Sequence, residues 1–322
     1  MTERTKIDAF ADTMAERPNE TLVGDEPSPR VPSEDLTGTR MAHFRVESLV
    51  REGGMGSVWR AHDESLDRPV ALKVLTRELS REPRLVERFK REARSQARLS
   101  HGNVVPIYYI GESDGLMFFA MELIEGESLA DRLERGERLQ SRRAVELMIG
   151  VGRALRHAHQ RGLIHRDVKP GNLLVDATGH VKVADFGLAL PMEPDGRKLT
   201  GKGVFLGTPW YCSPEQARAQ DLDHRADMYA FGACFYHLIV GRPLFDGKTP
   251  FAILAKHAAD VPDLSALRAC APGGVVELFA RLLAKSPDDR FIDHDIVVQT
   301  LKQFRMRETS SWSTLEHDSH GE

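Results

Sequence analysis

The chain has 322 residues, of which 41% are hydrophobic and 29% are charged, and its formal net charge at pH 7 is -4. This length and balance allow one large or two small packed units and exclude a fibrous protein. The slightly acidic charge argues against a nucleic-acid partner, because phosphates are bound by strongly basic surfaces.

No stretch of the sequence is typical of a membrane span or a secretory signal. The longest apolar-leaning run, residues 228–240, is interrupted by Gly232 and His237 and is too short to cross a bilayer. The first residues carry charges at positions 3, 4, 6 and 8 and lack an apolar core. The three cysteines form no C-x-x-C pair and suit reduced thiols. We therefore expect a cytoplasmic protein with no membrane segment in this chain.

The predicted elements divide the chain into a small and a large lobe between two tails. Residues 1–42 are rich in Glu, Asp, Pro, Ser and Thr, which predicts a disordered arm, with a marginal amphipathic helix near its start as the alternative. Residues 43–124 form the predicted N-lobe, with short strands at 44–50, 57–61, 70–75, 105–110 and 117–123 and one helix at 82–99.

Helical spacing dominates residues 125–305, the predicted C-lobe, with long helices expected around 144–155 and 276–283. Residues 306–322 lack periodicity and are expected to be a disordered tail. The sequence therefore predicts an α+β fold with a β-rich N-lobe that contains one helix, a mainly helical C-lobe, and a ligand-binding cleft between them.

The N-lobe carries a glycine-rich turn and an isolated lysine. Residues 52–58 read Glu-Gly-Gly-Met-Gly-Ser-Val between two expected strands, where glycines let backbone N–H groups approach phosphates. An ordinary glycine-rich hairpin is the alternative for this stretch alone. Lys73 lies in the apolar strand 70–75 and needs an anion if it is buried, for which Glu92 on the next helix is available. Its alternative is a side chain that extends to solvent.

The C-lobe carries two clusters of polar residues between apolar segments. His165-Arg166-Asp167-Val168-Lys169-Pro170-Gly171-Asn172 lies between Leu163-Ile164 and Leu173-Leu174-Val175. Asp185-Phe186-Gly187 follows the short apolar strand 181–184. Two carboxylates, an ammonium group and an amide that converge in this way suit phosphoryl transfer, which needs positioning and charge neutralisation.

The pattern H-R-D-x-K-x-x-N followed by D-F-G resembles the protein kinase family. The resemblance covers residues 43–305 and implies the two-lobed kinase fold, with ATP as donor and Mg²⁺, or alternatively Mn²⁺, as metal. It implies that Asp167 accepts the proton of the substrate hydroxyl, and that Lys169 stabilises the moving phosphoryl group. Asn172 and Asp185 would be the metal ligands. Lys73 would hold the α and β phosphates and be positioned by Glu92 when the helix that carries Glu92 swings inward.

The same resemblance implies a nucleotide site shared by the two lobes. Val58, Ala71 and Leu174 would sandwich the adenine, and Met121, Glu122 and Ile124 would form the hinge, with Met121 as gatekeeper. Simple core packing is the alternative for the apolar members. The glycine-rich hairpin would cover the phosphates with Val50, Arg51, Glu52, Gly53, Gly54, Met55, Gly56, Ser57 and Val58.

The acceptor side also follows the family pattern. Lys169-Pro170 resembles the Ser/Thr class, and residues 207–215 resemble the segment that receives the peptide, with Thr208 near Asp167. Glu215 is expected to pair with Arg290, which favours a protein substrate, and Asp227 is expected to brace the catalytic loop. The resemblance therefore implies a non-specific serine/threonine protein kinase.

Regulation is expected through Arg166, which in the family pairs with a phosphorylated residue of the activation loop. Thr200 is the candidate for autophosphorylation, with the chain itself as partner in a transient homodimer; an ordinary exposed threonine is the alternative. Gly-Gly-Met-Gly, Lys-Pro-Gly-Asn and Ser-Pro-Glu-Gln resemble the bacterial branch of the family.

Two positions depart from the family pattern. Arg51 stands where the family usually has glycine, and a left-handed backbone there would cost about 1–2 kcal/mol. Gln96 stands at a usually apolar place in a stack with Phe186 and His165, which predicts a less stable inward position of the helix and low resting activity. The competing class is a pseudokinase, a nucleotide-binding or scaffold module without transfer activity.

Overall fold

The computed structural model describes residues 34–186 and 209–307, and the chain divides into two units, residues 1–34 and 35–322. The second unit holds the fold. Most of the predicted arm, the predicted tail from residue 308 onward and the predicted site residues Thr200 and Thr208 lie outside the described residues. The fold begins before the predicted boundary at residue 43, because Leu36 is buried in the core and a short strand pairs at residues 40–41.

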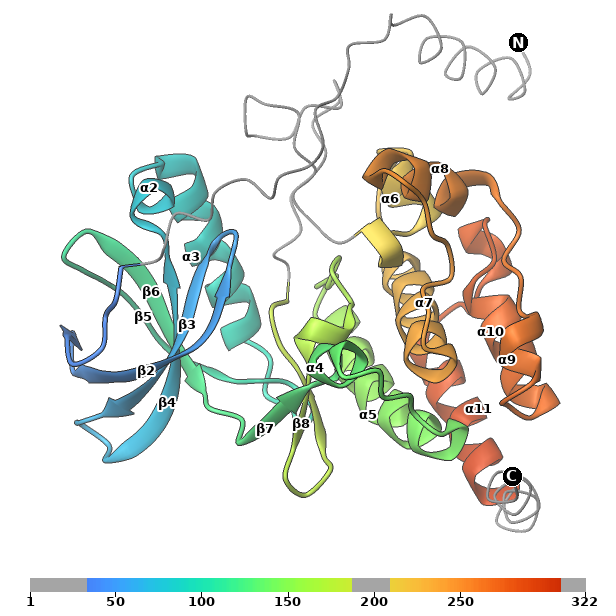
Figure 1. The fold of residues 1–322 in the computed structure, drawn as a ribbon, viewed down its shortest axis with the longest axis horizontal. Coiled ribbons are helices and arrows are strands. Elements are labelled where there is room, and N and C mark those ends of the chain that lie inside the picture. The colour runs from blue at the N-terminus through green and yellow to red at the C-terminus, as the bar shows by residue number, and fades with distance from the viewer. Residues whose placement is uncertain (1–33, 187–208, 308–322) are drawn as a thin grey trace, which may run out of the picture. The chain divides into compact units, whose positions relative to one another are not determined.

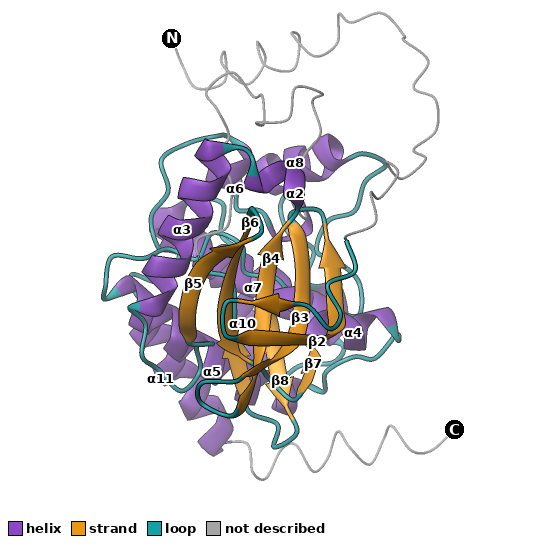
Figure 2. Cartoon of the chain, turned by 90° about the vertical axis from the view of Figure 1, so that its left-hand side faces the viewer, coloured by secondary structure: helices purple, strands orange, loops and turns teal. Residues whose placement is uncertain are grey.

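The N-lobe is built on a six-stranded antiparallel sheet with strand order β1-β2-β3-β4-β6-β5 (Figures 1 and 2). All five strands predicted in this region are present, and β1 is additional. The bounds are β1 Arg40–Met41, β2 Phe44–Gly53, β3 Gly56–Asp63, β4 Arg68–Leu75, β5 Ile107–Ser113 and β6 Leu116–Glu122.

Alternation along β4 places Lys73 on the face of the sheet that forms the site. Val70, Leu72 and Val74 pack into one hydrophobic cluster with Phe44 and Trp59. Because successive side chains point to opposite faces, Ala71 and Leu75 pack into a second cluster, and Lys73 lies between them on that face.

The predicted N-lobe helix is α3 (Pro83–Ala97), which packs Phe89 and Ala93 into this second cluster. Proline at its first helical turn suits the helix start, since that turn has no intrahelical partner for the N–H group. The short helix α2 (Arg77–Ser80) precedes it and is capped by the Thr76 side chain.

The C-lobe is built around two long helices, α5 (Ser141–His159) and α7 (Arg225–Val240), and α7 is buried on nearly all sides. A three-stranded sheet has the order β7-β8-β9, and Figure 1 shows β7 and β8 on the side of α5 toward the N-lobe strands. Among the described residues, no helix combines the length and the apolar character that a membrane span requires. The remaining bounds are β7 Gly126–Ser128, α4 Leu129–Glu134, η1 Pro170–Asn172, β8 Leu173–Asp176, β9 Val181–Val183, η2 Pro209–Tyr211, α6 Pro214–Ala217, α8 Pro250–Ala259, α9 Ser265–Arg268, α10 Gly273–Leu282, η3 Pro287–Asp289 and α11 His294–Arg307.

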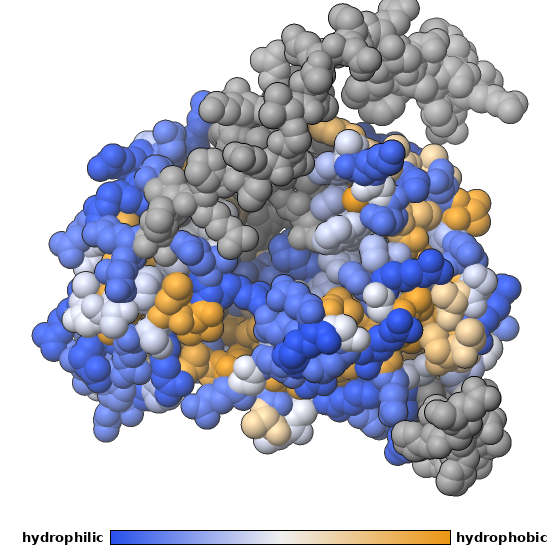
Figure 3. Space-filling view, viewed as in Figure 1, coloured by the Kyte–Doolittle hydropathy of each residue, from blue (hydrophilic) through white to orange (hydrophobic). Residues whose placement is uncertain are grey.

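These elements confirm the predicted α+β fold with a β-rich N-lobe and a helical C-lobe. The predicted helices around 144–155 and 276–283 are α5 and α10, and α11 lies against α5 (Figure 1). On the face shown in Figure 3, hydrophobic side chains occur in small groups among hydrophilic ones. The large apolar side chains are mostly in the cores of the two lobes.

Candidate functional site

The loop between α5 and β8 is fixed by one buried carboxylate. Asp227, in the first turn of α7, is fully buried, and its Oδ2 accepts hydrogen bonds from the His165 backbone N–H at 2.8 Å and from His159 Nε2 at 2.9 Å. Its Oδ1 accepts the backbone N–H of Arg166 at 2.7 Å. These bonds hold Arg166 in a left-handed conformation with φ of 68°. Asp227 therefore braces this loop as the sequence led us to expect.

Burial alone would raise the pKa of Asp227. The hydrogen bond and charge of His159, together with His165, outweigh this effect and hold the pKa of the carboxyl below its usual range. The brace is therefore an ionised group at neutral pH, which strengthens its hydrogen bonds to the loop.

The structure brings three of the predicted site residues of this loop together. Asp167 Oδ2 lies 2.6 Å from Lys169 Nζ. The Asn172 amide donates to the Asp167 carbonyl at 2.8 Å and to Asp167 Oδ2 at 3.2 Å. Asn172 is buried, whereas Asp167 and Lys169 are partly exposed, so the carboxylate is held in position and stays accessible to a substrate.

Asp185 follows β9 and faces the N-lobe. Its backbone is left-handed, with φ of 59°, and its Oδ1 lies 2.7 Å from Lys73 Nζ. The Ala184 N–H bonds to the Asn172 carbonyl at 2.9 Å, which holds the strand that ends at Asp185 beside the catalytic loop. A loop of the C-lobe and a strand of the N-lobe therefore meet through a direct ion pair.

The expected ion pair between Lys73 and Glu92 is not formed in this structure. Glu92 Oε1 instead accepts from Arg88 Nε at 2.7 Å, one turn earlier on α3, while Lys73 pairs with Asp185. Burial raises the pKa of Glu92 more than the hydrogen bond and charge of Arg88 lower it. The hydrogen bond and charge of Arg88 therefore do not fully offset the cost of burying the ionised carboxylate of Glu92.

Gln96 takes part in a network that the sequence did not predict. The residue is buried; its Nε2 donates to the Val105 carbonyl at 2.8 Å, and its Oε1 accepts the Phe186 N–H at 3.0 Å. The Phe186 ring lies 4.6 Å from the His165 ring. The expected stack of His165 and Phe186 is present, and Gln96 ties it to α3 by hydrogen bonds instead of apolar contact.

The predicted adenine-binding residues belong to one hydrophobic cluster. Ala71 and Met121 are buried in it, and Val58, Ile124 and Leu174 pack against it while remaining partly exposed. Glu122 is turned toward the C-lobe, where its Oε2 lies 2.5 Å from Lys182 Nζ. This arrangement lines a site between the lobes with apolar side chains from both.

The glycine-rich hairpin joins β2 to β3, with Gly53 opposite Gly56. Gly56 has φ of 154°, and a Cβ there would lie 1.9 Å from the Val74 carbonyl oxygen, so no other residue fits. Val50, before the hairpin turn, is 57% exposed. Of the other hairpin residues, Ser57 is buried and bonded to the Trp59 indole, while Glu52, Gly53 and Gly54 are exposed and Met55 is half-buried.

Arg51 does not adopt a left-handed conformation, so the cost that such a backbone would carry does not arise. It lies in β2 opposite Val58, and the strand accommodates it by a register irregularity between Leu49 and Arg51. Its guanidinium reaches Asp131 and Ser128 in the C-lobe. Sequence reasoning missed these partners, although Ser128-x-x-Asp131 has the spacing of a capping box.

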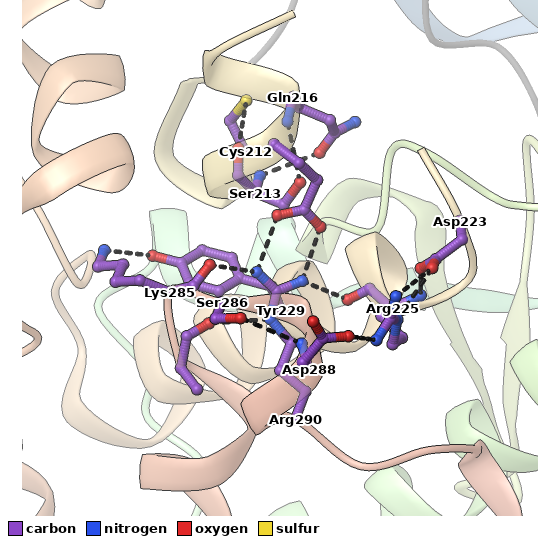
Figure 4. Close-up of polar contacts among 12 residues, drawn as sticks. Cys212, Ser213, Gln216, Asp223, Arg225, Tyr229, Lys285, Ser286, Asp288 and Arg290 are labelled. Carbon is purple, nitrogen blue, oxygen red and sulfur yellow. Dashed lines mark hydrogen bonds and ion pairs between the residues drawn. The ribbon is translucent and has the colours of Figure 1, made fainter. Parts of the chain in front are cut away.

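The segment predicted to receive the peptide is held by a buried ion pair. Arg290 donates to Glu215 Oε1 at 2.6 Å and to Oε2 at 2.8 Å, and Figure 4 shows the guanidinium against the Tyr229 ring. Gln216, next to Glu215, donates to the Arg166 carbonyl at 2.8 Å. The segment that follows η2 is thereby tied to the catalytic loop, a link that sequence reasoning missed.

The donor set at Asn172 and Asp185 fits a hard divalent cation. A carboxylate and an amide oxygen are ligands that Mg²⁺ prefers. The hydrogen bonds of Asn172 use the NH₂ end of its amide, which leaves the oxygen end to face a cation. In the present arrangement Lys73 occupies the place of a cation beside Asp185.

Comparison with known proteins gives a consistent result. A sequence model described as "Protein kinase domain" matches residues 44–300. The chain is 39% identical over 258 residues to serine/threonine-protein kinase PknA of Mycobacterium tuberculosis, which covers 79% of this chain and 59% of PknA. It is 41% identical over 269 residues to serine/threonine-protein kinase pkn3 of Myxococcus xanthus, covering 80% and 49%. The chain therefore matches about half of the length of these curated relatives.

A solved structure is similar as well. The kinase domain of Mycobacterium tuberculosis PknI has a TM-score of 0.66 and 28% sequence identity, and the match covers 83% of this chain and 98% of that domain.

Proposed function

The chain belongs to the protein kinase domain family, and from that premise we propose that it transfers the γ-phosphoryl group of ATP to serine and threonine hydroxyls of proteins. The observation that carries the proposal is the hydrogen-bonded group of Asp167, Lys169 and Asn172 next to the Lys73–Asp185 pair. The similarity to Ser/Thr kinases at about 40% identity supports the same acceptor class.

Each side chain has a role that its position supports. Asp167, held by Asn172, orients the acceptor hydroxyl and accepts its proton. Lys169, now 2.6 Å from Asp167, is close enough to stabilise negative charge on the phosphoryl group. Lys73 binds the phosphates on the N-lobe side.

Asn172 and Asp185 would hold Mg²⁺, with Mn²⁺ as the alternative metal. When bound, the metal neutralises phosphate charge during transfer. Asp185 is available for that role only after Lys73 leaves it, and Glu92 is the buried acid positioned to take Lys73 over. We therefore propose that the pairs Lys73–Asp185 and Arg88–Glu92 belong to a resting arrangement of these side chains.

We extend the proposal to regulation at Thr200, with a second copy of the chain as transient partner. Arg166 lies in the catalytic loop, and its carbonyl accepts a hydrogen bond from Gln216, which follows Thr200 in the sequence. A phosphate on Thr200 would give the Arg166 side chain an anionic partner. The cytoplasmic location expected from the sequence stays a prediction.

The test is phosphoryl transfer by the purified protein with labelled ATP, Mg²⁺ and a generic protein acceptor, beside an Asp167→Asn control. We expect label on serine and threonine of the acceptor, and a loss of about 100-fold or more in the control, because general-base contributions are of that order. Equal label in the two samples would favour the rival reading, a nucleotide-binding module without transfer activity. Mass analysis of the same samples shows whether Thr200 gains a phosphate and whether Thr200→Ala lacks it.

A further inference from the structure

Arg51 reaches from the N-lobe side of the proposed nucleotide site to its C-lobe side. In β2 it lies directly opposite Val58, and side chains of such cross-strand neighbours share one face of the sheet. Val58 packs on the adenine cluster, so Arg51 leaves the strand on the same side. A Cβ built on Gly171 of the catalytic loop would lie 3.5 Å from Arg51 Nη1.

The partner of Arg51 is a carboxylate at the start of the first C-lobe helix. Arg51 Nη2 lies 2.5 Å from Asp131 Oδ1 and 3.1 Å from Ser128 Oγ. Ser128 pairs in turn with Leu174 in the β7–β8 ladder, and Leu174 packs on the adenine cluster. The ion pair therefore spans the two walls that carry the adenine residues.

Hydrogen bonds at the start of α4 hold the Asp131 side chain in place for this contact. Its Oδ2 accepts the Ser128 N–H at 2.9 Å and the Ser128 hydroxyl at 2.7 Å, which closes the capping box of α4 and leaves Oδ1 for Arg51. Burial alone would raise the pKa of Asp131, but hydrogen bonds from Ser128 and the charge of Arg51 hold it below its usual range. The carboxylate is thus fixed and ionised.

We propose that Arg51 and Asp131 form an interlobe clasp that closes the glycine-rich hairpin over bound nucleotide and slows its release. The inference rests on the nucleotide-binding part of the proposed function. Arg51 is a positioning residue in this account: its guanidinium stays on Asp131 and does not bind the phosphates.

The test measures release of a fluorescent ADP analogue with Mg²⁺ by stopped flow, in the whole chain and in Arg51→Gln, Asp131→Asn and the double variant. Gln keeps a long side chain without charge, and Asn can still cap α4. The pair is 44% and 36% exposed, so we expect each single variant to release the analogue about 2- to 5-fold faster. The double variant should be no faster than either single variant, since all three lack the same contact.

The control is Glu137→Gln, which breaks the exposed ion pair with Arg135 at the other end of α4, within one lobe. It should leave the release rate unchanged. The release rate of Arg51→Gln divided by that of the unmodified chain should fall toward one at 1 M KCl, because charges are then screened within about 3 Å.

Other outcomes overturn the clasp. If Arg51 were a phosphate ligand, Asp131→Asn would free it and slow release, whereas Arg51→Gln would speed it. Additive effects, or no effect in the two single variants, would also exclude the clasp. Release of ADP does not depend on transfer, because ADP carries no γ-phosphoryl group. If the variants change the release rate but the chain transfers no phosphoryl group, the clasp stands and only the proposed catalysis is refuted. If the chain binds the ADP analogue and no variant changes its release rate, only the clasp is refuted.

Discussion

The side chain of Arg290 is buried in the C-lobe and depends on polar partners for its charge. It is fully buried, forms a two-pronged ion pair with Glu215, and donates to the carbonyls of Ala284 and Arg225 at 2.9 and 2.7 Å. Arg290→Ala would leave the Glu215 charge buried without a partner. We expect a loss of about 3–5 kcal/mol in the free energy of unfolding, measured by urea denaturation.

Two variants show whether this loss comes from burial. Arg290→Lys keeps the charge without the planar fork and should give an intermediate loss. Asp288→Asn breaks the ion pair of Arg225 with a side chain that is 85% exposed, and should cost less than about 1 kcal/mol. Equal losses in Arg290→Ala and Asp288→Asn would contradict this account.

Single residues were predictable from sequence where a motif fixes the partner. The pairing of Glu215 with Arg290 and the contact of Asp227 with the catalytic loop were expected because these segments resemble those of the protein kinase family. The partner of Arg51 could not be predicted, because Arg51 departs from the family pattern and its contact with Asp131 joins two lobes and depends on the position of the hairpin. The backbone cost that a left-handed Arg51 would carry does not arise, because Arg51 lies in a β-strand beside a shift in register.

At the scale of elements, the position of α3 was the least predictable feature of the site. The sequence identifies the helix and its buried face, but not which of two cations Glu92 contacts. A small rotation of a helix is enough to move a carboxylate such as that of Glu92 from one cation to another. In the structure Arg88 holds Glu92, and Gln96 fixes the end of the same helix to Phe186 and to the approach to β5.

Arg88→Gln should shift α3 toward the transfer-competent arrangement. It removes the present partner of Glu92 and so favours its pairing with Lys73, which releases Asp185 for the metal. We expect the initial rate of phosphoryl transfer by unphosphorylated protein to rise about 2- to 5-fold, the equivalent of up to about 1 kcal/mol. Arg94→Gln, an exposed change on the same helix, is the control. A lower rate in Arg88→Gln would show that Arg88 supports the active arrangement.

At the scale of the whole molecule, buried histidines make the C-lobe sensitive to acid. Burial lowers the pKa of His237 to about 4, and burial together with the charge of Lys285 lowers the pKa of His257 to about 3. Burial also lowers the pKa of His294, in α11. The three histidines come from α7, α8 and α11, so one change of pH acts on helices from different parts of the lobe.

The sign of the pH effect follows from which state binds protons. Below pH 6.5 the unfolded chain protonates these histidines while the folded chain does not, so stability is present above about pH 6.5 and is lost as the pH falls toward 4 and 3. His257→Gln should flatten the dependence of the unfolding free energy between pH 6.5 and 5.5 by about 1 kcal/mol per pH unit. Tyr229→Phe, which removes the hydroxyl bonded to His257 but keeps the histidine, should lower stability and retain the slope. An unchanged slope in His257→Gln, measured by denaturant unfolding at each pH, would show that His257 titrates alike in the folded and unfolded chain.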